Sequence, residues 1–150
     1  MRRVRRRALI ALGVLLFLAI SFVVARFLTT EGDERTAINR LLEAQVAGDA
    51  TKMLDALDDG CRADARCRQV VEDNARKLKA GGDPKVISLK SETAYALGAA
   101  TGTTRVAWSV LDGSLPVVQC VEVHRGGNAL TGRTVTLLRI SAPIGNESSC

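Results

Sequence analysis

The segment AINRLLEAQVAGDATKMLDALDDG, residues 37 to 60, has the pattern of two consecutive helices. Its apolar side chains recur every three or four positions, which is the spacing of one buried helix face. Gly48 can end the first helix in the left-handed conformation, and Asp49 can cap the next one. The sequence therefore predicts one helix from Asp33 to about Ala47 and a short second helix that stops at DDG. The residues expected to face inward are Ile38, Leu41, Leu42, Val46, Met53, Leu54 and Leu57.

A third helix and a run of strands follow this pair. Residues 63 to 80 have another apolar stripe, and GGDP at 81 to 84 ends it. Beyond Pro84 the chain is rich in β-branched residues, and glycine or proline separates the segments. The candidate strands are KVISLKS (85–91), TAYALGAA (93–100), TTRVAWSVL (103–111), PVVQCVEVHR (116–125) and RTVTLLRISA (133–142). This order predicts an α+β fold, with three helices packed on a curved antiparallel sheet of four to five strands.

The N-terminus predicts a transmembrane helix. MRRVRRR at residues 1 to 7 contains five arginines, and residues 8 to 25 are uncharged and mostly apolar. A helix over residues 8 to 28 is about 31 Å long, close to the ~30 Å hydrocarbon thickness of a bilayer. Because arginines favour the cytoplasmic side, we expect a single-pass protein of the cell membrane with a cytoplasmic N-terminus.

This anchor sets the expected domain boundaries. Residues 1–28 form the basic tip and the membrane anchor, residues 29–32 a linker, and residues 33–150 an extracytoplasmic domain. The alternative is a signal peptide that is cleaved after Ala25, in the sequence VVA. In both cases the domain that follows lies outside the cytoplasm.

The charge distribution argues against nucleic-acid binding. Six of the 21 Lys and Arg residues lie within residues 1 to 26, so the remainder carries 15 basic against 16 acidic residues, a net charge of −1. A nucleic-acid-binding protein needs a basic face that neutralises phosphates, and the composition of this domain offers none. The basic residues are therefore interpreted as a topology signal.

The helix pair of residues 37 to 60 resembles the opening of the nuclear transport factor-like α+β cone superfamily, which includes SnoaL-type polyketide cyclases. The shared features are the first helix, the Gly-Asp junction and the short second helix, and the resemblance extends over about residues 33 to 142. It implies a cone-shaped domain, inside which enzymes of this fold hold acid–base residues. An anchor followed by such a domain is also similar to actinobacterial accessory membrane proteins, such as the Mce-associated ones.

Four cysteines all follow the anchor: Cys61, Cys67, Cys120 and Cys150. An even number in an extracytoplasmic domain predicts two disulfides. Zinc is disfavoured because C-x5-C is not a usual ligand spacing and the chain has a single histidine. We favour Cys61–Cys67, which flank a short connection between helices, together with Cys120–Cys150, which would hold the polar tail to the sheet.

Strand parity separates inward from outward residues. In PVVQCVEVHR, Gln119 and Val121 share the apolar face, whereas Glu122 and His124 share the other. Glu122 and His124 are therefore expected to point outward as an exposed polar pair. The competing interpretation is a catalytic dyad, which would need both groups inside the cone.

The candidates for a ligand pocket are Tyr95, Trp108, Gln119, Val121 and Arg139. The two aromatic residues either line a cavity or pack in the core. Gln119 either lines a pocket or makes a structural hydrogen bond, because a buried amide needs a partner. Arg139 is expected to be a solvated cation on the sheet, with a buried anion site as the alternative.

The sequence contains no G-x-S-x-G, phosphate-binding, dinucleotide-binding or zinc motif. We therefore predict no catalytic residues, metal or cofactor. The leading hypothesis is a non-catalytic, membrane-tethered extracytoplasmic domain that binds an envelope partner protein or a small apolar ligand. The alternatives are a SnoaL-like enzyme acting on a hydrophobic substrate and a structural component of the envelope.

Overall fold

The computed structural model describes residues 2–93, 99–110, 115–128, 132–145 and 149–150 of the 150-residue chain. This part of the chain contains four helices and an antiparallel four-stranded sheet, which confirms the α+β class. The helices are α1 (Arg2–Ala47), α2 (Ala50–Asp55), α3 (Asp59–Ala63) and α4 (Ala65–Lys77). The strands are β1 (Lys85–Ser91), β2 (Ala100–Ser109), β3 (Val117–Asn128) and β4 (Gly132–Ile140).

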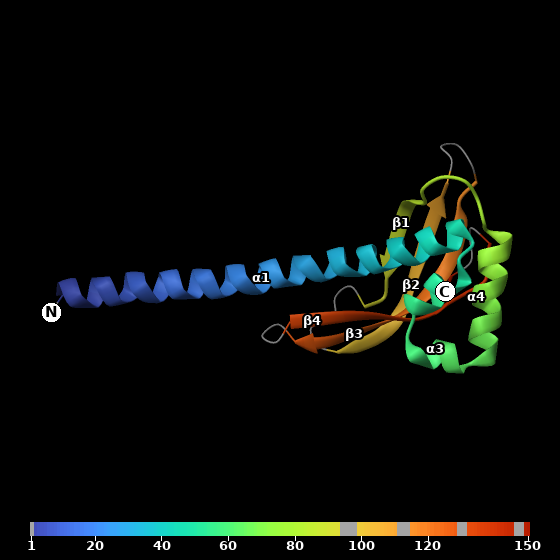
Figure 1. The fold of residues 1–150 in the computed structure, drawn as a ribbon. Coiled ribbons are helices and arrows are strands. Elements are labelled where there is room, and N and C mark those ends of the chain that lie inside the picture. The colour runs from blue at the N-terminus through green and yellow to red at the C-terminus, as the bar shows by residue number, and fades with distance from the viewer. Residues whose placement is uncertain (1, 94–98, 111–114, 129–131, 146–148) are drawn as a thin grey trace.

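Helix α1 is one uninterrupted helix of 46 residues, and its N-terminal part extends from the domain as a rod (Figure 1). The linker expected at residues 29 to 32 is therefore helical, and Asp33 lies inside the helix instead of capping it. Glycine lowers helix stability by only about 1 kcal/mol relative to alanine, so Gly32 alone does not break the helix. The turns after Gly32 pack against the sheet, and this packing extends the helix through the polar stretch.

Gly48 ends α1, as the sequence predicts. Its φ of 75° is the left-handed conformation that glycine adopts without strain. The N–H of Gly48 donates to the carbonyl of Gln45 at 3.0 Å, and the N–H of Asp49 donates to the carbonyl of Ala44 at 2.9 Å. These paired bonds are those of a Schellman C-cap. The chain therefore reverses within two residues into α2.

An aspartate begins each of the three shorter helices. Asp49, Asp58 and Asp64 are the N-caps of α2, α3 and α4, and their carboxylates accept backbone N–H bonds of 3.0, 2.8 and 2.9 Å. The DDG stretch that was predicted to stop the second helix also starts a new one, because the Asp58 side chain caps the one-turn helix α3. The third helix predicted at residues 63 to 80 is shorter than expected, since α4 begins after Asp64 and ends at Lys77.

The strands form a meander in the order β1-β2-β3-β4, each antiparallel to the next. The sheet is strongly twisted, α1 crosses it, and α4 lies at the end of the domain away from the N-terminus of the chain (Figure 1). The irregularity between Val86 and Ser88 leaves Ile87 58% exposed on the edge strand. The strand expected at residues 93 to 100 falls mostly outside the described residues.

Both predicted disulfides are present. Cys61 of α3 bonds to Cys67 of α4, and Cys120 of β3 bonds to Cys150. Before it reaches Cys150, the C-terminal segment runs beside β3, where the N–H of Ile144 donates to the Val118 carbonyl at 2.8 Å. The two bridges therefore fix the α3–α4 turn and the end of the chain.

The core lies between the inner face of the sheet and helices α1, α2 and α4. Of the seven residues predicted to face inward in the first two helices, Leu54 is half-buried and the others are buried. From the sheet and α4 the core receives Val71, Ala75, Val106, Trp108, Val121, Val123, Leu137 and Ile140. Helix α1 thus covers the inner face of the sheet.

Candidate functional site

A hydrogen-bonded amide cluster occupies the centre of the inner face. The Gln119 side chain is fully buried, and its Oε1 accepts from Gln45 Nε2 at 2.9 Å and from the Trp108 indole N–H at 3.0 Å. Its Nε2 donates to the Ser141 carbonyl at 3.0 Å. Every polar atom of the Gln119 side chain is therefore satisfied inside the protein. Val121 beside it is also fully buried and belongs to the core.

The outer face of β3 carries Glu122 and His124, as parity predicts, but they do not pair. Glu122 lies 4.0 Å from the Arg139 guanidinium, which also contacts Asp64 at 3.2 Å. His124 Nδ1 lies 2.8 Å from the Thr101 hydroxyl. The Arg139 side chain is 56% exposed and takes part in a surface ion-pair network instead of a buried anion site.

The pKa of Asp64 is lowered below its usual 3.8 by the hydrogen bond from the Arg66 backbone N–H and by the nearby Arg139. The pKa of Asp49 is lowered for the same kind of reason, chiefly by the N–H of Lys52. Both carboxylates are helix caps, so these shifts reflect structure and do not identify a catalytic acid.

A buried ion pair between α1 and β3 was not predicted from the sequence. Glu34 is fully buried, and its Oε2 accepts from Arg125 Nε at 2.9 Å. The Thr104 hydroxyl donates to the other carboxylate oxygen at 2.6 Å, and Arg125 Nη1 donates to the Thr93 carbonyl at 3.1 Å. The sequence does indicate that both side chains face inward. Glu34 lies one helical turn before the buried Ile38, and Arg125 is on the same face of β3 as the inward residues Val121 and Val123.

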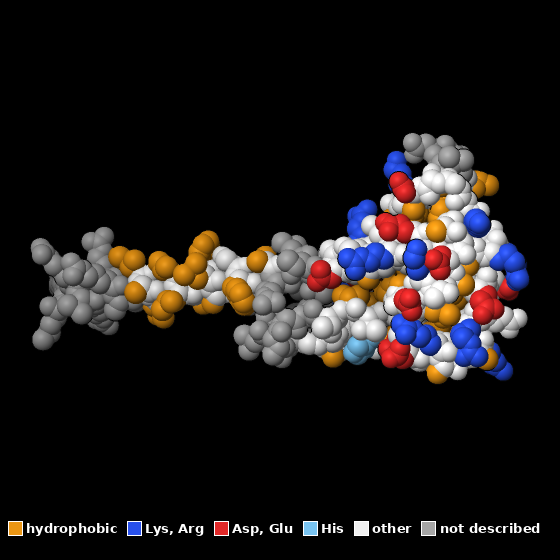
Figure 2. All heavy atoms as spheres, in the orientation of Figure 1, with side chains coloured by type: hydrophobic (Ala, Val, Ile, Leu, Met, Phe, Trp, Pro, Cys, Tyr) orange, Lys and Arg blue, Asp and Glu red, His pale blue; other side chains and the backbone are white. Residues whose placement is uncertain are grey.

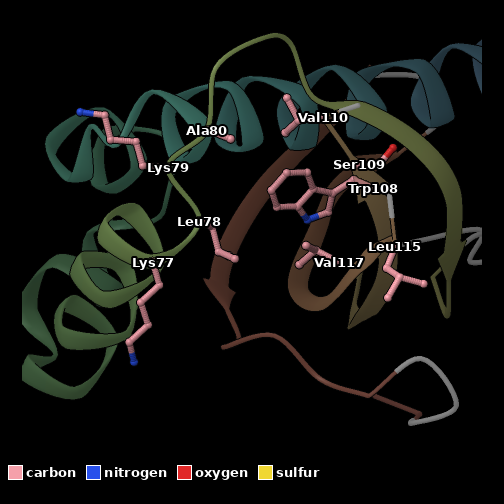
Figure 3. A pocket seen from close by; sticks show the side chains of 9 residues that line it. All are labelled: Lys77, Leu78, Lys79, Ala80, Trp108, Ser109, Val110, Leu115 and Val117. Atoms are coloured by element: carbon pink, nitrogen blue, oxygen red, sulfur yellow. The ribbon is translucent and has the colours of Figure 1, made fainter. Parts of the chain in front are cut away.

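An apolar groove of about 290 Å³ lies where the C-terminal end of α4 meets the ends of β2 and β3. We call it the Trp108 groove, and it is lined by Lys77, Leu78, Lys79, Ala80, Trp108, Ser109, Val110, Leu115 and Val117. Figure 3 shows the Trp108 indole at its centre, with Leu78, Val110 and Val117 around the ring. Leu115 at the edge is 86% exposed, the largest exposed fraction of the exposed apolar side chains described.

A second hollow, between α1 and α2, differs in chemistry. Its volume is about 490 Å³, and its rim carries the side chains of Arg40, Glu43, Lys52 and Asp55. Because its lining combines two basic and two acidic side chains, this hollow presents neither an apolar surface nor a surface of one charge. The Trp108 groove is therefore the better candidate site. Of the five predicted pocket residues, only Trp108 lines it, and Tyr95 falls outside the described residues.

The rod of α1 exposes many large apolar side chains (Figure 2). They are Ile10, Leu12, Val14, Leu15, Leu16, Phe17, Leu18, Ile20, Phe22 and Val24, which are 50% to 70% exposed. Within the residues that were described, no helix met the combined length and apolarity expected of a membrane span. The same residues contain no group of three or more His, Cys, Asp or Glu side chains that could hold a metal ion.

No protein-family model matches the chain, and no significant match was found among curated proteins or solved structures.

Proposed function

We propose that this protein is a membrane-tethered, extracytoplasmic, non-catalytic domain that binds a partner protein or a small apolar ligand in the Trp108 groove. The observation that carries the proposal is the groove itself, an apolar hollow beside a highly exposed leucine. Its lining includes the C-terminal end of α4, a helix that lies at the end of the domain away from the free end of α1 (Figure 1). A tether at one end would leave this site open to a partner.

The exposed apolar residues of α1 support the tether. Ten large apolar side chains between Ile10 and Val24 surround the helix and would each favour transfer from water to lipid. The two disulfides fit an oxidising compartment outside the cytoplasm. A reporter that is active only outside the cytoplasm should therefore work when fused after Cys150. Activity of a cytoplasm-only reporter at this position would reverse the topology, and a mature N-terminus at Arg26 would reveal cleavage.

We also propose that the domain belongs to the nuclear transport factor-like cone class. The support for this is the order of elements, with the helix pair of residues 37 to 60 packed across a twisted antiparallel sheet. In this chain helix α1 and the amide cluster fill the inner face. Binding is therefore assigned to the groove at the edge of the fold and not to a central cavity.

A non-catalytic role is supported by the hydrogen bonds and ion pairs that the acidic and basic side chains make within the protein. Glu122 faces Arg139, His124 faces Thr101, and Glu34 is neutralised by Arg125. General acid–base catalysis needs a group that can reach a substrate and exchange a proton with it. Among the described residues, none of these groups lines the Trp108 groove.

The binding proposal can be tested with the fluorescence of Trp108, the single tryptophan of the chain. The full-length protein in phosphatidylcholine vesicles would be titrated with cyclohexanol and with the neutral peptide N-acetyl-Ser-Gln-Phe-Gln-Ser-amide. We expect a saturable change in emission with at least one probe. Leu115→Asp should abolish this change, whereas Ile87→Asp, at an exposed apolar residue outside the groove, should preserve it. No saturable change with either probe would refute the proposal.

A further inference from the structure

We infer that the Trp108 groove receives one large apolar side chain from a protein segment whose flanking residues are acidic. This inference rests on the proposed binding function and specifies the chemistry of the partner. It follows from three features of the groove: its volume, its shortage of hydrogen-bonding side chains and the cations at its rim.

The volume favours a side chain over a lipid. Pockets for drug-sized ligands typically measure about 300–1,000 Å³, and the groove, at about 290 Å³, lies at the lower limit. It has room for one aromatic or branched apolar group but not for a long acyl chain. Single apolar anchors that fill a pocket at the centre of an interface commonly dominate protein–protein affinity.

The lining favours an apolar group inside the groove. The Trp108 N–H is already bonded to Gln119 and the side chain is only 1% exposed, so the indole forms the buried apolar floor of the groove and offers no free donor. Apart from Ser109, which is buried, the other lining side chains are aliphatic or are lysines at the rim. A polar group placed here would lose its hydrogen bonds to water without replacement. Leu115 lines the groove and is 86% exposed, so an apolar anchor packed against it would remove apolar surface from water.

The rim favours acidic neighbours of that anchor. In Figure 3 the aliphatic stems of Lys77 and Lys79 border the groove while their amines point away from the Trp108 ring. Lys77 is partly neutralised by Asp73 at 3.6 Å, and Lys79 has no ion-pair partner among the described residues. These amines would meet the residues on either side of the anchor and not the anchor itself. An apolar centre with a charged rim is the usual anatomy of a protein interface.

The test compares three peptides that share one phenylalanine anchor, with Trp108 fluorescence as the readout. The full-length protein in phosphatidylcholine vesicles is titrated with N-acetylated, amidated Asp-Glu-Phe-Glu-Asp, Ser-Gln-Phe-Gln-Ser and Lys-Arg-Phe-Arg-Lys. At low salt the acidic peptide should bind about tenfold more tightly than the neutral one, and the basic peptide should bind most weakly. The preference should shrink at about 1 M salt, where charges more than ~3 Å apart are screened.

Variants assign the preference to the rim. The double variant Lys77→Gln/Lys79→Gln should lose the preference for the acidic peptide but still bind the neutral one. Lys90→Gln, at an exposed lysine of β1 outside the groove, is the matched control and should keep the preference. Leu115→Asp should abolish binding of all three peptides.

The other outcomes separate this inference from the proposed function. Equal affinity for the acidic and neutral peptides would overturn the acidic partner and leave the binding function standing. Failure of all three peptides, together with cyclohexanol, would overturn both. Displacement of the acidic peptide by phosphatidylglycerol vesicles would show that the rim binds lipid headgroups, and it would overturn the inference that the partner is a protein segment. Emission that changes with protein concentration alone would assign the groove to a second copy of this chain.

Discussion

Replacing Glu34 with glutamine should strongly destabilise the domain. The substitution keeps the shape and a hydrogen-bond acceptor but removes the negative charge beside Arg125, whose side chain is only 3% exposed. Removing one partner of a buried ion pair costs about 3–5 kcal/mol, because the other charge stays desolvated without compensation. That is a large share of the total stability of about 5–15 kcal/mol that is usual for a domain. Urea unfolding of the full-length chain, followed by circular dichroism and tryptophan fluorescence, measures the loss.

Two further variants identify burial as the cause. Glu34→Met/Arg125→Met removes both charges, so it should be markedly more stable than Glu34→Gln alone and close to wild type. Arg139→Gln breaks the surface ion pair of an arginine that is 56% exposed and should cost only about 0–1 kcal/mol. A loss of under about 1 kcal/mol for Glu34→Gln, similar to that of Arg139→Gln, would refute the reasoning. It would mean that water solvates the pair and that the pair does not hold α1 to the sheet.

Four other substitutions probe separate parts of the fold. Gln119→Leu should lower the unfolding free energy by about 1–3 kcal/mol, because the indole N–H and the facing amide lose a buried partner; a neutral result in urea unfolding would show that they find another. Replacing both Cys120 and Cys150 with alanine should cost up to about 3.7 kcal/mol, the chain-entropy value for a 31-residue loop, and an unchanged unfolding midpoint would argue against this bridge in solution. Asp64→Asn should lower the melting temperature at pH 7. Because the pKa of Asp64 is lowered by folding, the advantage of the wild type is present above the usual value of 3.8 and should vanish as the pH falls through the folded pKa; an advantage that grows in acid would contradict this assignment. His124→Ala should change stability by no more than about 0.5 kcal/mol in thermal melts, and a larger loss would place the imidazole in the core.

The parts of the fold that sequence could predict depend on short-range interactions. Gly48 and Asp49 make their capping bonds within five residues, so local pattern identifies both. The α+β order and the inner face of β3 follow from periodicity for the same reason. The local sequence could not predict that α1 continues through residues 29 to 32. A polar stretch with one glycine has almost balanced preferences for helix and coil, and the packing of the turns that follow decides between them.

The candidate site depends on contacts between distant parts of the chain. Glu34 and Arg125 are 91 positions apart, and their pairing requires the phase of a helix and the register of a strand at once. The number and positions of the four cysteines were enough to predict both disulfides, because four cysteines can be paired in only a few ways. Trp108 was identified as a candidate, but its groove is completed by the end of α4 and by Leu115. No single segment of sequence carries the pattern of that surface.

Because α1 is one continuous helix, the rotation of its N-terminal segment about the helix axis also sets the rotation of the domain. The helix is about 69 Å long at 1.5 Å per residue, and each residue turns it by about 100°. The Glu34 contact fixes the rotation of this helix against the sheet. If one side of residues 10 to 24 contacts a neighbouring molecule, that contact therefore also sets the direction, about the helix axis, in which the groove opens. Two copies joined along that side would hold their grooves at a fixed mutual angle. One residue inserted in the rod would swing that angle by about 100° per copy without altering a single contact in the domain.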